Sequence, residues 1–243
     1  MHCSSKKTVK TCLANLVVGN AAADHLVTCD NHKRYADKIG VPHVVVHGRT
    51  VPDPPRNYPV IYKDAKKFNP LFLKFQITDL FQEFDRILFL DLDTVVTRTC
   101  PNILNFVPET RCGFVDEFAY IRPSSKKYHH DLTTKSGQWP LMWFYINSGV
   151  FVLPKCHADK YRYNPALDHQ GAFDQDMLGL ACQKDPDSYV LLDVRFNHTY
   201  MMRDFFWRDM ASAWIIHTAG FTLNKPAAQR QALLQALVRD FGL

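Results

Sequence analysis

The sequence has no apolar run long enough to cross a membrane, which would need roughly 20 consecutive apolar residues. Its first 18 residues, MHCSSKKTVKTCLANLVV, also lack the long apolar segment of a signal peptide. Their apolar part is interrupted and fits a first strand better. We therefore expect a soluble, cytoplasmic chain, although a longer natural protein could carry an anchor or further domains.

The cysteines form no C-x-x-C motif, and their odd number argues against a closed disulfide framework. We expect them to be mainly small core residues of a protein from a reducing compartment. The seven are Cys3, Cys12, Cys29, Cys100, Cys112, Cys156 and Cys182.

The net charge is only +5, and no block of five or six basic residues occurs. The longest basic cluster is Lys126 and Lys127 beside His129 and His130. A concentrated basic face would be expected of a nucleic-acid-binding protein, so we expect no nucleic-acid partner, and the mild excess suits a small anionic substrate. The chain also lacks repeats, low-complexity tracts and linkers. With 243 residues and 47% hydrophobic content it predicts one globular domain.

What is present is an alternation of strand and helix patterns. A buried strand at 11–18, an amphipathic helix at 21–40 and a second strand at 43–47 predict a parallel α/β unit. Residues 51–59 hold four prolines and predict an irregular loop, and 69–84 predict a helix. Further expected elements are a short helix after Pro101, strands at 112–115, 146–153, 189–192 and 213–217, and helices at 174–182 and 226–241.

Residues 116–140 are polar and carry no clear periodicity. They predict either a mobile flap that meets an acceptor or a solvated insertion.

The stretch Arg86 to Val96, RILFLDLDTVV, organises the chain. Its continuous apolar part predicts a strand that is covered on both faces. Asp91 and Asp93 follow at once, and in an extended segment two such carboxylates project to the same side. Like charges held so close are tolerated when a cation sits between them. The alternative is that one carboxylate caps the turn and the other is solvated.

A D-x-D at the end of a strand is typical of two protein classes. In haloacid-dehalogenase-type phosphatases it reads D-x-D-G-T near the start of the chain. Here Thr94 follows Asp93, the motif lies past residue 90, and the supporting G-D-x-x-x-D pattern is absent. In nucleotide-sugar transferases of the GT-A fold, the two carboxylates hold Mn²⁺ or Mg²⁺ on the donor diphosphate.

Four motifs favour the second class: FLDLDTVV, INSGVFVL, FDQDML and HTAGFTLNK. They occur in the order seen in glycosyltransferase family 8, which includes glycogenin and bacterial lipopolysaccharide galactosyltransferases. Over roughly residues 11–226 the sequence resembles that family.

The resemblance implies an α/β protein of the GT-A fold, with one Rossmann-like catalytic domain over 1–243 and a central, mostly parallel mixed sheet flanked by helices. Residues 11–100 would form the nucleotide-binding half, and 101–243 would complete the acceptor and metal sites. The implied activity is metal-dependent transfer of a hexose, with retention, from a UDP-sugar such as UDP-glucose or UDP-galactose. The acceptor would be a glycan, a lipid-linked sugar or a protein.

By resemblance, Asp91, Asp93 and His217 would be the metal ligands. Two carboxylates, one imidazole and diphosphate oxygens form a ligand set that suits Mn²⁺. The alternative for His217 is a core histidine at a strand end.

Two lysines would contact the donor. Lys225 resembles the family's phosphate-contacting lysine, but it lies five residues after Gly220 instead of the usual three. The alternative is a solvated lysine at a helix start. Lys74, on the helix before the D-x-D strand, would reach donor hydroxyls and phosphate, and the alternative is an exposed helical lysine.

The sugar and the nucleotide would meet further residues. Asn147 and Ser148, with Gly149, would form the floor of the site at the turn into their strand. Asp174 would bind sugar hydroxyls, Gln175 would face the anomeric carbon, and Asp176 continues that motif. The alternative is a carboxylate-rich helix start that the helix dipole stabilises.

At the end of the first strand, Val18, Gly19 and Asn20 would cradle uracil and ribose, and Leu92 would belong to the same donor site. Glycogenin-like members have an aromatic residue shortly after this strand, where this chain has only alanines.

By resemblance, Asp174, Gln175 and Asp176 would be the catalytic residues, but no protein nucleophile is obvious among them. Gln175 is a neutral amide, and Asp176 is a possible nucleophile that is expected to point elsewhere on its helix. Same-face attack, with the leaving phosphate oxygen taking the acceptor's proton, suits these residues. Self-glycosylation on one of ten tyrosines and an inactive sugar-binding module stay open. Aromatic side chains could stack on a sugar or belong to the core; they are Trp139, Trp143, Tyr145, Trp207 and Trp214.

Overall fold

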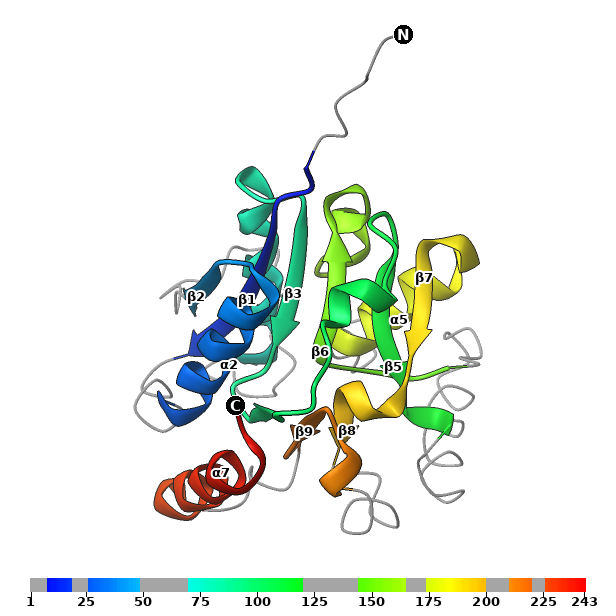
Figure 1. The fold of residues 1–243 in the computed structure, drawn as a ribbon. Helices are drawn as coiled ribbons and strands as arrows, with labels where there is room; N and C mark the ends of the chain where they lie inside the picture. Colours follow the sequence, from blue (N-terminus) through cyan, green and yellow to red (C-terminus); the bar gives the residue numbers. More distant parts are fainter. Residues whose placement is uncertain are drawn as a thin grey trace, which may run out of the picture.

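The computed structural model describes residues 8–18, 26–48, 70–119, 144–164, 174–199, 210–219 and 226–243. Its centre is a six-stranded sheet with the order β2-β1-β3-β6-β5-β7 (Figure 1). Only β6 runs antiparallel to its neighbours, so the mostly parallel mixed sheet expected from the sequence is confirmed. The strands are β1 Thr11–Val18, β2 His43–Gly48, β3 Arg86–Leu90, β5 Cys112–Asp116, β6 Ile146–Pro154 and β7 Tyr189–Leu192.

In the described ranges, three α-helices and several 3₁₀ helices accompany the sheet. The α-helices are α2 Leu26–Ile39, α5 Asp174–Gln183 and α7 Ala227–Phe241. The longest 3₁₀ helix is η1 Pro70–Gln82. The short ones are η2 Ile103–Phe106, η3 Glu117–Ala119, η4 Lys155–Lys160, η5 Pro186–Ser188, η6 Val194–Asn197 and η7 Met210–Ser212.

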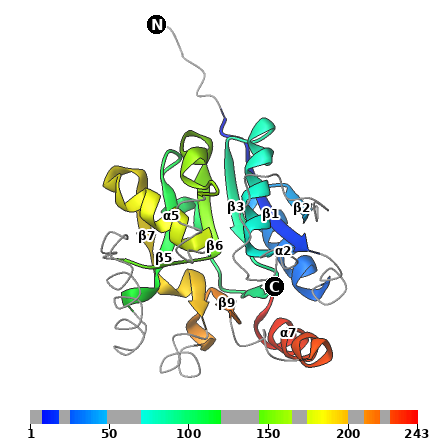
Figure 2. The ribbon, with the colours of Figure 1, turned by 180° about the vertical axis from the view of Figure 1, so that it is seen from behind.

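The centre of the sheet is buried on both faces, which explains why β3 is continuously apolar. Leu88 and Leu90 point toward α2 and pack in one cluster with its Tyr35. Ile87 and Phe89 point the other way and pack with η1 and α5. Figures 1 and 2 show α2 and α5 on opposite faces of the sheet.

The helix expected at 69–84 is a 3₁₀ helix, and its sequence period explains the difference. Phe72, Phe75, Thr78 and Phe81 recur every three residues, which aligns side chains in a 3₁₀ helix. The three phenylalanines are buried in the cluster under β3.

A second, small sheet lies beside the carboxyl end of β3. It consists of β4 Thr94–Val96, β9 Ile215–His217 and β8 His198–Thr199, in the order β4-β9-β8. The strand expected at 213–217 therefore begins at Ile215. The sequence pattern did not predict β8, because two residues are too few for a periodic signal.

Helix α7 covers the small sheet and fixes β4 from the side opposite β3. Val95 and Ile216 pack with Leu234 and Leu237 of α7. Arg98 donates hydrogen bonds from its guanidinium to the carbonyls of Arg239 and Asp240 at the end of the helix. These carbonyls have no partner within the helix, so the arginine caps it.

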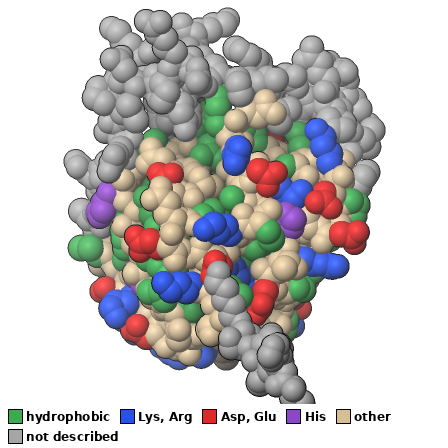
Figure 3. Space-filling view, turned by 90° about the horizontal axis from the view of Figure 1, so that it is seen from above, with side chains coloured by type: hydrophobic (Ala, Val, Ile, Leu, Met, Phe, Trp, Pro, Cys, Tyr) green, Lys and Arg blue, Asp and Glu red, His purple; other side chains and the backbone are tan. Residues whose placement is uncertain are grey.

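Within the described ranges, no helix combines the length and the apolar character that a membrane crossing requires. Lysine and arginine side chains on the face in Figure 3 are interspersed with aspartate and glutamate. Six cysteines are described and all are free thiols, four of them buried. The loop expected at 51–59 and residues 120–140 of the expected flap lie outside the described ranges.

Candidate metal and nucleotide-sugar site

Asp91 and Asp93 lie on a turn between β3 and β4. Thr94 donates its amide and its hydroxyl to the carbonyl of Asp91, over 3.1 and 2.7 Å, and the Asp91 amide donates to the Gly149 carbonyl over 2.7 Å. The two carboxylates lie close together after a buried strand, as expected, but they lie on a turn and not on an extended segment. The turn and its hydrogen bond to Gly149 of β6 set the positions of the two carboxylates.

Pairing within the small sheet brings His217 to this turn. Thr94 pairs with His217 in the β4 and β9 ladder, and the amide of Thr218 donates to the carbonyl of Asp93 over 3.0 Å. The Nε2 atom of His217 lies 3.2 Å from Asp93 Oδ1 and 4.0 Å from Asp91 Oδ2.

One potential ligand atom from each of Asp91, Asp93 and His217 lies within 4.8 Å of the others. The donor set of two carboxylate oxygens and one imidazole nitrogen fits Mn²⁺ or Mg²⁺ with further oxygen ligands. Two carboxylates so close repel each other, and a bound cation would remove that repulsion.

Helix α2 supports the turn through polar residues that the sequence analysis missed. Thr28 donates to the Leu92 carbonyl over 2.6 Å, and Asn31 makes two hydrogen bonds with the backbone of Val96. His32 Nε2 lies 3.0 Å from the Thr94 carbonyl. All three side chains are buried. Their i, i+3, i+4 spacing places them on one face of the helix. Polar residues at helical spacing on the inward face of an amphipathic helix were the sequence signal that could have revealed them.

Lys74 is buried beside the turn, so the alternative of an exposed helical lysine is wrong. Its Nζ donates to Asp91 Oδ2 over 2.8 Å and to Ser148 Oγ over 3.3 Å, and it lies 3.9 Å from Asp174 Oδ2. Burial by itself lowers the pKa of Lys74, but the charges of Asp91 and Asp174 more than reverse this, and the pKa lies above its usual value. Lys74 is therefore a protonated cation between two carboxylates.

The imidazole of His217 is buried and packed against backbone. A Cβ on Gly149 would lie 2.1 Å from His217 Cε1, so only glycine leaves room for the ring. His217 Nδ1 lies 2.9 Å from Asn197 Oδ1. Burial lowers the pKa of His217, but Asp93 and Asp91 raise it by more. The sequence pattern gave no signal for Asn197.

The sequence analysis expected Asn147 and Ser148 at a turn before their strand. In the structure both lie within β6. Both are buried. Asn147 Oδ1 accepts a hydrogen bond from the Gly149 amide over 2.9 Å, and Ser148 accepts one from Lys74. The strand therefore contributes polar side chains beside the carboxylate turn.

The start of α5 contributes further polar side chains to the site. Asp174 is buried and accepts a hydrogen bond from the Tyr161 hydroxyl over 3.1 Å. Gln175 donates its amide to the Tyr145 hydroxyl. Burial, with the nearby Asp176 carboxylate second, raises the pKa of Tyr145 well above its usual value. Stabilisation of these carboxylates by the helix dipole is compatible with this arrangement.

The sequence profile of glycosyl transferase family 8 matches residues 62–217, more than half of the chain. The chain belongs to this family. Its membership of a glycosyltransferase family contradicts the alternative that it is a haloacid-dehalogenase-type phosphatase. The matched range includes the carboxylate turn and ends at His217. No curated protein matches the sequence.

Solved structures show that this glycosyltransferase has the GT-A fold. It is similar to the galactosyltransferase LgtC in complex with donor and acceptor sugar analogues, with 14% identity, a TM-score of 0.60, and coverage of 92% of this chain and 95% of LgtC. It is also similar to a glycosyltransferase involved in the glycosylation of the major capsid of PBCV-1, with 13% identity, a TM-score of 0.55, and coverage of 92% and 99%.

Some expected site residues lie outside the described ranges, so their assignments stay predictions. They are Gly19, Asn20, Gly220 and Lys225, together with Trp139, Trp143 and Trp207. Val18 is half-buried at the end of β1 and pairs with Gly48.

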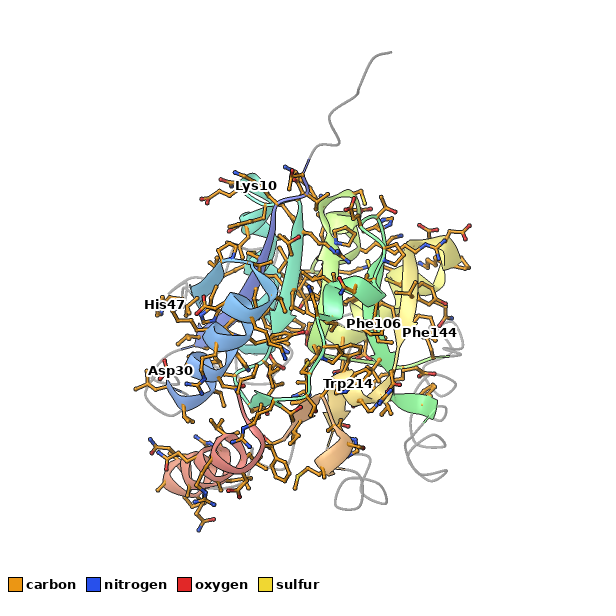
Figure 4. All side chains as sticks on the ribbon, in the orientation of Figure 1. Lys10, Asp30, His47, Phe106, Phe144 and Trp214 are labelled. Carbon is orange, nitrogen blue, oxygen red and sulfur yellow. The ribbon has the colours of Figure 1, made fainter. Side chains whose placement is uncertain are left out.

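Two of the candidate stacking aromatics contact the hydrophobic core, Tyr145 as a buried residue and Trp214 as a half-buried one packed against it. Trp214 contacts Phe106 and Phe196, at ring distances of 6.0 and 4.6 Å, and Arg195 lies over its ring at 3.8 Å (Figure 4). Tyr145 is buried and stacks on Phe118 at 5.3 Å. Core packing accounts for both.

Glu117, directly after β5, is a buried carboxyl group that the sequence analysis missed. Its Oε1 has no hydrogen-bond partner among the described residues. Burial raises the pKa of Glu117 from 4.5 to about 7, because interactions with Thr199, His217 and Asn147 offset the desolvation only in part.

The raised pKa predicts that Glu117 destabilises the fold above neutral pH. Its contribution is most favourable below pH 4.5, the usual pKa, where both states bind the proton, and it falls as pH rises toward about 7, because the unfolded state releases the proton first. At about 1.4 kcal/mol per pKa unit, Glu117→Gln should be more stable than the parent at pH 8 by up to about 3 kcal/mol, with little difference at pH 4.5.

Urea unfolding in EDTA at both pH values measures this difference. The matched control is Glu83→Gln, which makes the same substitution at an exposed position. An effect of Glu117→Gln that is the same at pH 4.5 and pH 8 would contradict the raised pKa.

Proposed function

We propose that this glycosyltransferase transfers a hexose from a UDP-sugar, with UDP-glucose or UDP-galactose as the donor, and depends on Mn²⁺ or Mg²⁺. The observation that carries the proposal is the convergence of Asp91, Asp93 and His217 within 4.8 Å. The three would hold the cation, which when bound neutralises the charge that develops on a leaving diphosphate.

Lys74 has two roles in this proposal. It offsets the charges of Asp91 and Asp174, whose carboxylates lie 2.8 and 3.9 Å from its ammonium group. It also holds Asp91 and Ser148 in one arrangement through its hydrogen bonds. A site fixed before the substrate binds needs no reorganisation during the reaction.

The start of α5 would bind the sugar. Asp174 accepts hydrogen bonds from donor hydroxyls, and Gln175 faces the anomeric carbon with its amide held by Tyr145. Gln175 is a neutral amide and therefore a poor nucleophile, and Asp176 is buried, with its carboxylate close enough to raise the pKa of Tyr145. This favours same-face attack with retention, in which the leaving phosphate oxygen takes the proton of the acceptor hydroxyl.

Both halves of the chain would contribute to one catalytic domain over 1–243. The nucleotide-binding half, 11–100, supplies Lys74 and the carboxylate turn. The half from 101 to 243 supplies His217, β6 and α5, and it also carries the acceptor site. The acceptor is a glycan, a lipid-linked sugar or a protein; the similarity to LgtC, which was solved with donor and acceptor sugar analogues, supports a sugar.

A panel of UDP-sugars, scored for release of UDP, tests the proposal. With Mn²⁺ we expect release from UDP-glucose or UDP-galactose well above the rate without protein, and EDTA should abolish it because the carboxylate turn then holds no cation. GDP-sugars are the matched control donors. If Mn²⁺ raises the melting temperature while no UDP-sugar is turned over with sugar acceptors present, the chain is an inactive binding module.

Intact mass after the same incubation separates the acceptor alternatives. Added hexose masses would identify the chain as its own acceptor, and an unchanged mass together with UDP release would exclude self-glycosylation.

A further inference from the structure

Asn197 lies directly behind the imidazole of His217. It ends η6, just before β8, and is fully buried at 0% exposure. Its Oδ1 is 2.9 Å from His217 Nδ1. Its Nδ2 is 3.3 Å from both the backbone carbonyl oxygen and the side-chain Oδ1 of Asn147.

The backbone of Asn147 fixes which way the Asn197 amide points. A carbonyl oxygen can only accept, so the donor of Asn197, its Nδ2, must face Asn147. The side-chain oxygen of Asn147 is itself oriented as an acceptor, because it accepts from the Gly149 amide over 2.9 Å. The amide of Asn197 therefore presents its oxygen to His217.

The orientation of that amide decides the tautomer of His217. An amide oxygen cannot donate, so Nδ1 must carry the proton in the hydrogen bond with Asn197. In the neutral imidazole, Nε2 then carries a lone pair. This lone pair faces Asp93 Oδ1 at 3.2 Å and Asp91 Oδ2 at 4.0 Å. A cation between this lone pair and the two carboxylates would be bound by all three groups.

Gly149 removes the remaining freedom of the ring. A Cβ there would lie 2.1 Å from Cε1 and 2.8 Å from each ring nitrogen, so the imidazole lies against the backbone of β6. The ring is thus held by packing on one face and by its contact with Asn197 at Nδ1.

We propose that Asn197, oriented by the backbone of Asn147, is a positioning residue that holds His217 as the Nδ1–H tautomer and thereby presents Nε2 to the divalent cation. This inference rests on the proposed function for the identity of the cation. Partners of this kind fix the orientation of a ligating imidazole, and their loss typically weakens metal affinity about 10- to 100-fold.

Binding of Mn²⁺ alone, without donor, tests the proposal through the electron paramagnetic resonance of free Mn²⁺. Asn197→Leu keeps the approximate volume but leaves Nδ1–H without an acceptor, and it should bind Mn²⁺ about 10- to 100-fold more weakly. Asn197→Asp restores the acceptor for Nδ1–H but loses the donor that faces Asn147, so it should recover part of the affinity. Equal affinities of Asn197→Leu and the parent would overturn the proposal.

The tautomer itself is measured by ¹⁵N nuclear magnetic resonance of the parent protein in EDTA, at a pH where His217 is neutral, with His217→Gln to assign the signal. We expect protonated Nδ1 and unprotonated Nε2, and the reverse pattern overturns the proposal even if Asn197→Leu fails to fold. If the parent binds no Mn²⁺, the proposed function fails, while the tautomer measurement still decides the role of Asn197.

Discussion

Replacing Asp93 with asparagine is expected to lower metal-dependent UDP release about 10²- to 10³-fold, the usual cost of removing one group that stabilises developing charge. The carboxylate Oδ1 lies 3.2 Å from His217 Nε2, so the substitution removes a charged ligand from the centre of the cluster. The fold should persist in EDTA, because the change also relieves the repulsion between Asp93 and Asp91.

Initial rates of UDP release, together with melting temperatures, measure this effect. Mn²⁺ at 100 times its Kd should stabilise the parent by about 2.7 kcal/mol and Asp93→Asn by much less. The matched control is Asp79→Asn, at an exposed position on η1, which should match the parent in both measurements. If Asp93→Asn keeps the rate of the parent, Asp93 is not a metal ligand.

Replacing Lys74 with methionine is expected to destabilise the metal-free protein by about 3–5 kcal/mol. This substitution leaves the carboxylates of Asp91 and Asp174 without their cation, and breaking a buried ion pair costs about that much. Because the pKa of Lys74 lies above its usual 10.5, the lysine is protonated throughout the neutral range, so the loss should not depend on pH there.

Bound Mn²⁺ should offset part of this loss, since it supplies positive charge to Asp91. Urea unfolding in EDTA and in Mn²⁺ measures both effects. Lys33→Met is the matched control, because Lys33 pairs with Asp37 at the surface and such helix pairs contribute less than about 0.5 kcal/mol. A Lys74→Met variant as stable in EDTA as Lys33→Met would show that Lys74 does not balance these charges.

The sequence by itself determined the local elements and the broad class. An interrupted apolar run predicted β1 at Thr11–Val18 with its observed bounds. The continuous apolar run of β3 predicted its burial on both faces, because a fully covered strand needs apolar residues on both sides. Two carboxylates placed two residues apart after β3 indicated a cation through their repulsion, with capping of the turn as the alternative. The prediction of His217 as the third metal ligand came from the resemblance to glycosyltransferase family 8 and not from any periodicity.

Only the tertiary structure decided how these groups meet. The bond from the Thr218 hydroxyl to the Asp93 carbonyl joins residues 125 positions apart, through a small sheet whose strands are too short to leave a pattern. Lys74 also looked compatible with an exposed helix face until packing placed it between two carboxylates.

The roles of Thr28, Asn31, His32 and Asn197 depend in the same way on which backbone groups lie opposite them. The hydrophobic periodicity of a segment indicates that the segment is buried and on which of its sides. It does not report its partner, because pairing between distant segments is set by the packing of the whole chain.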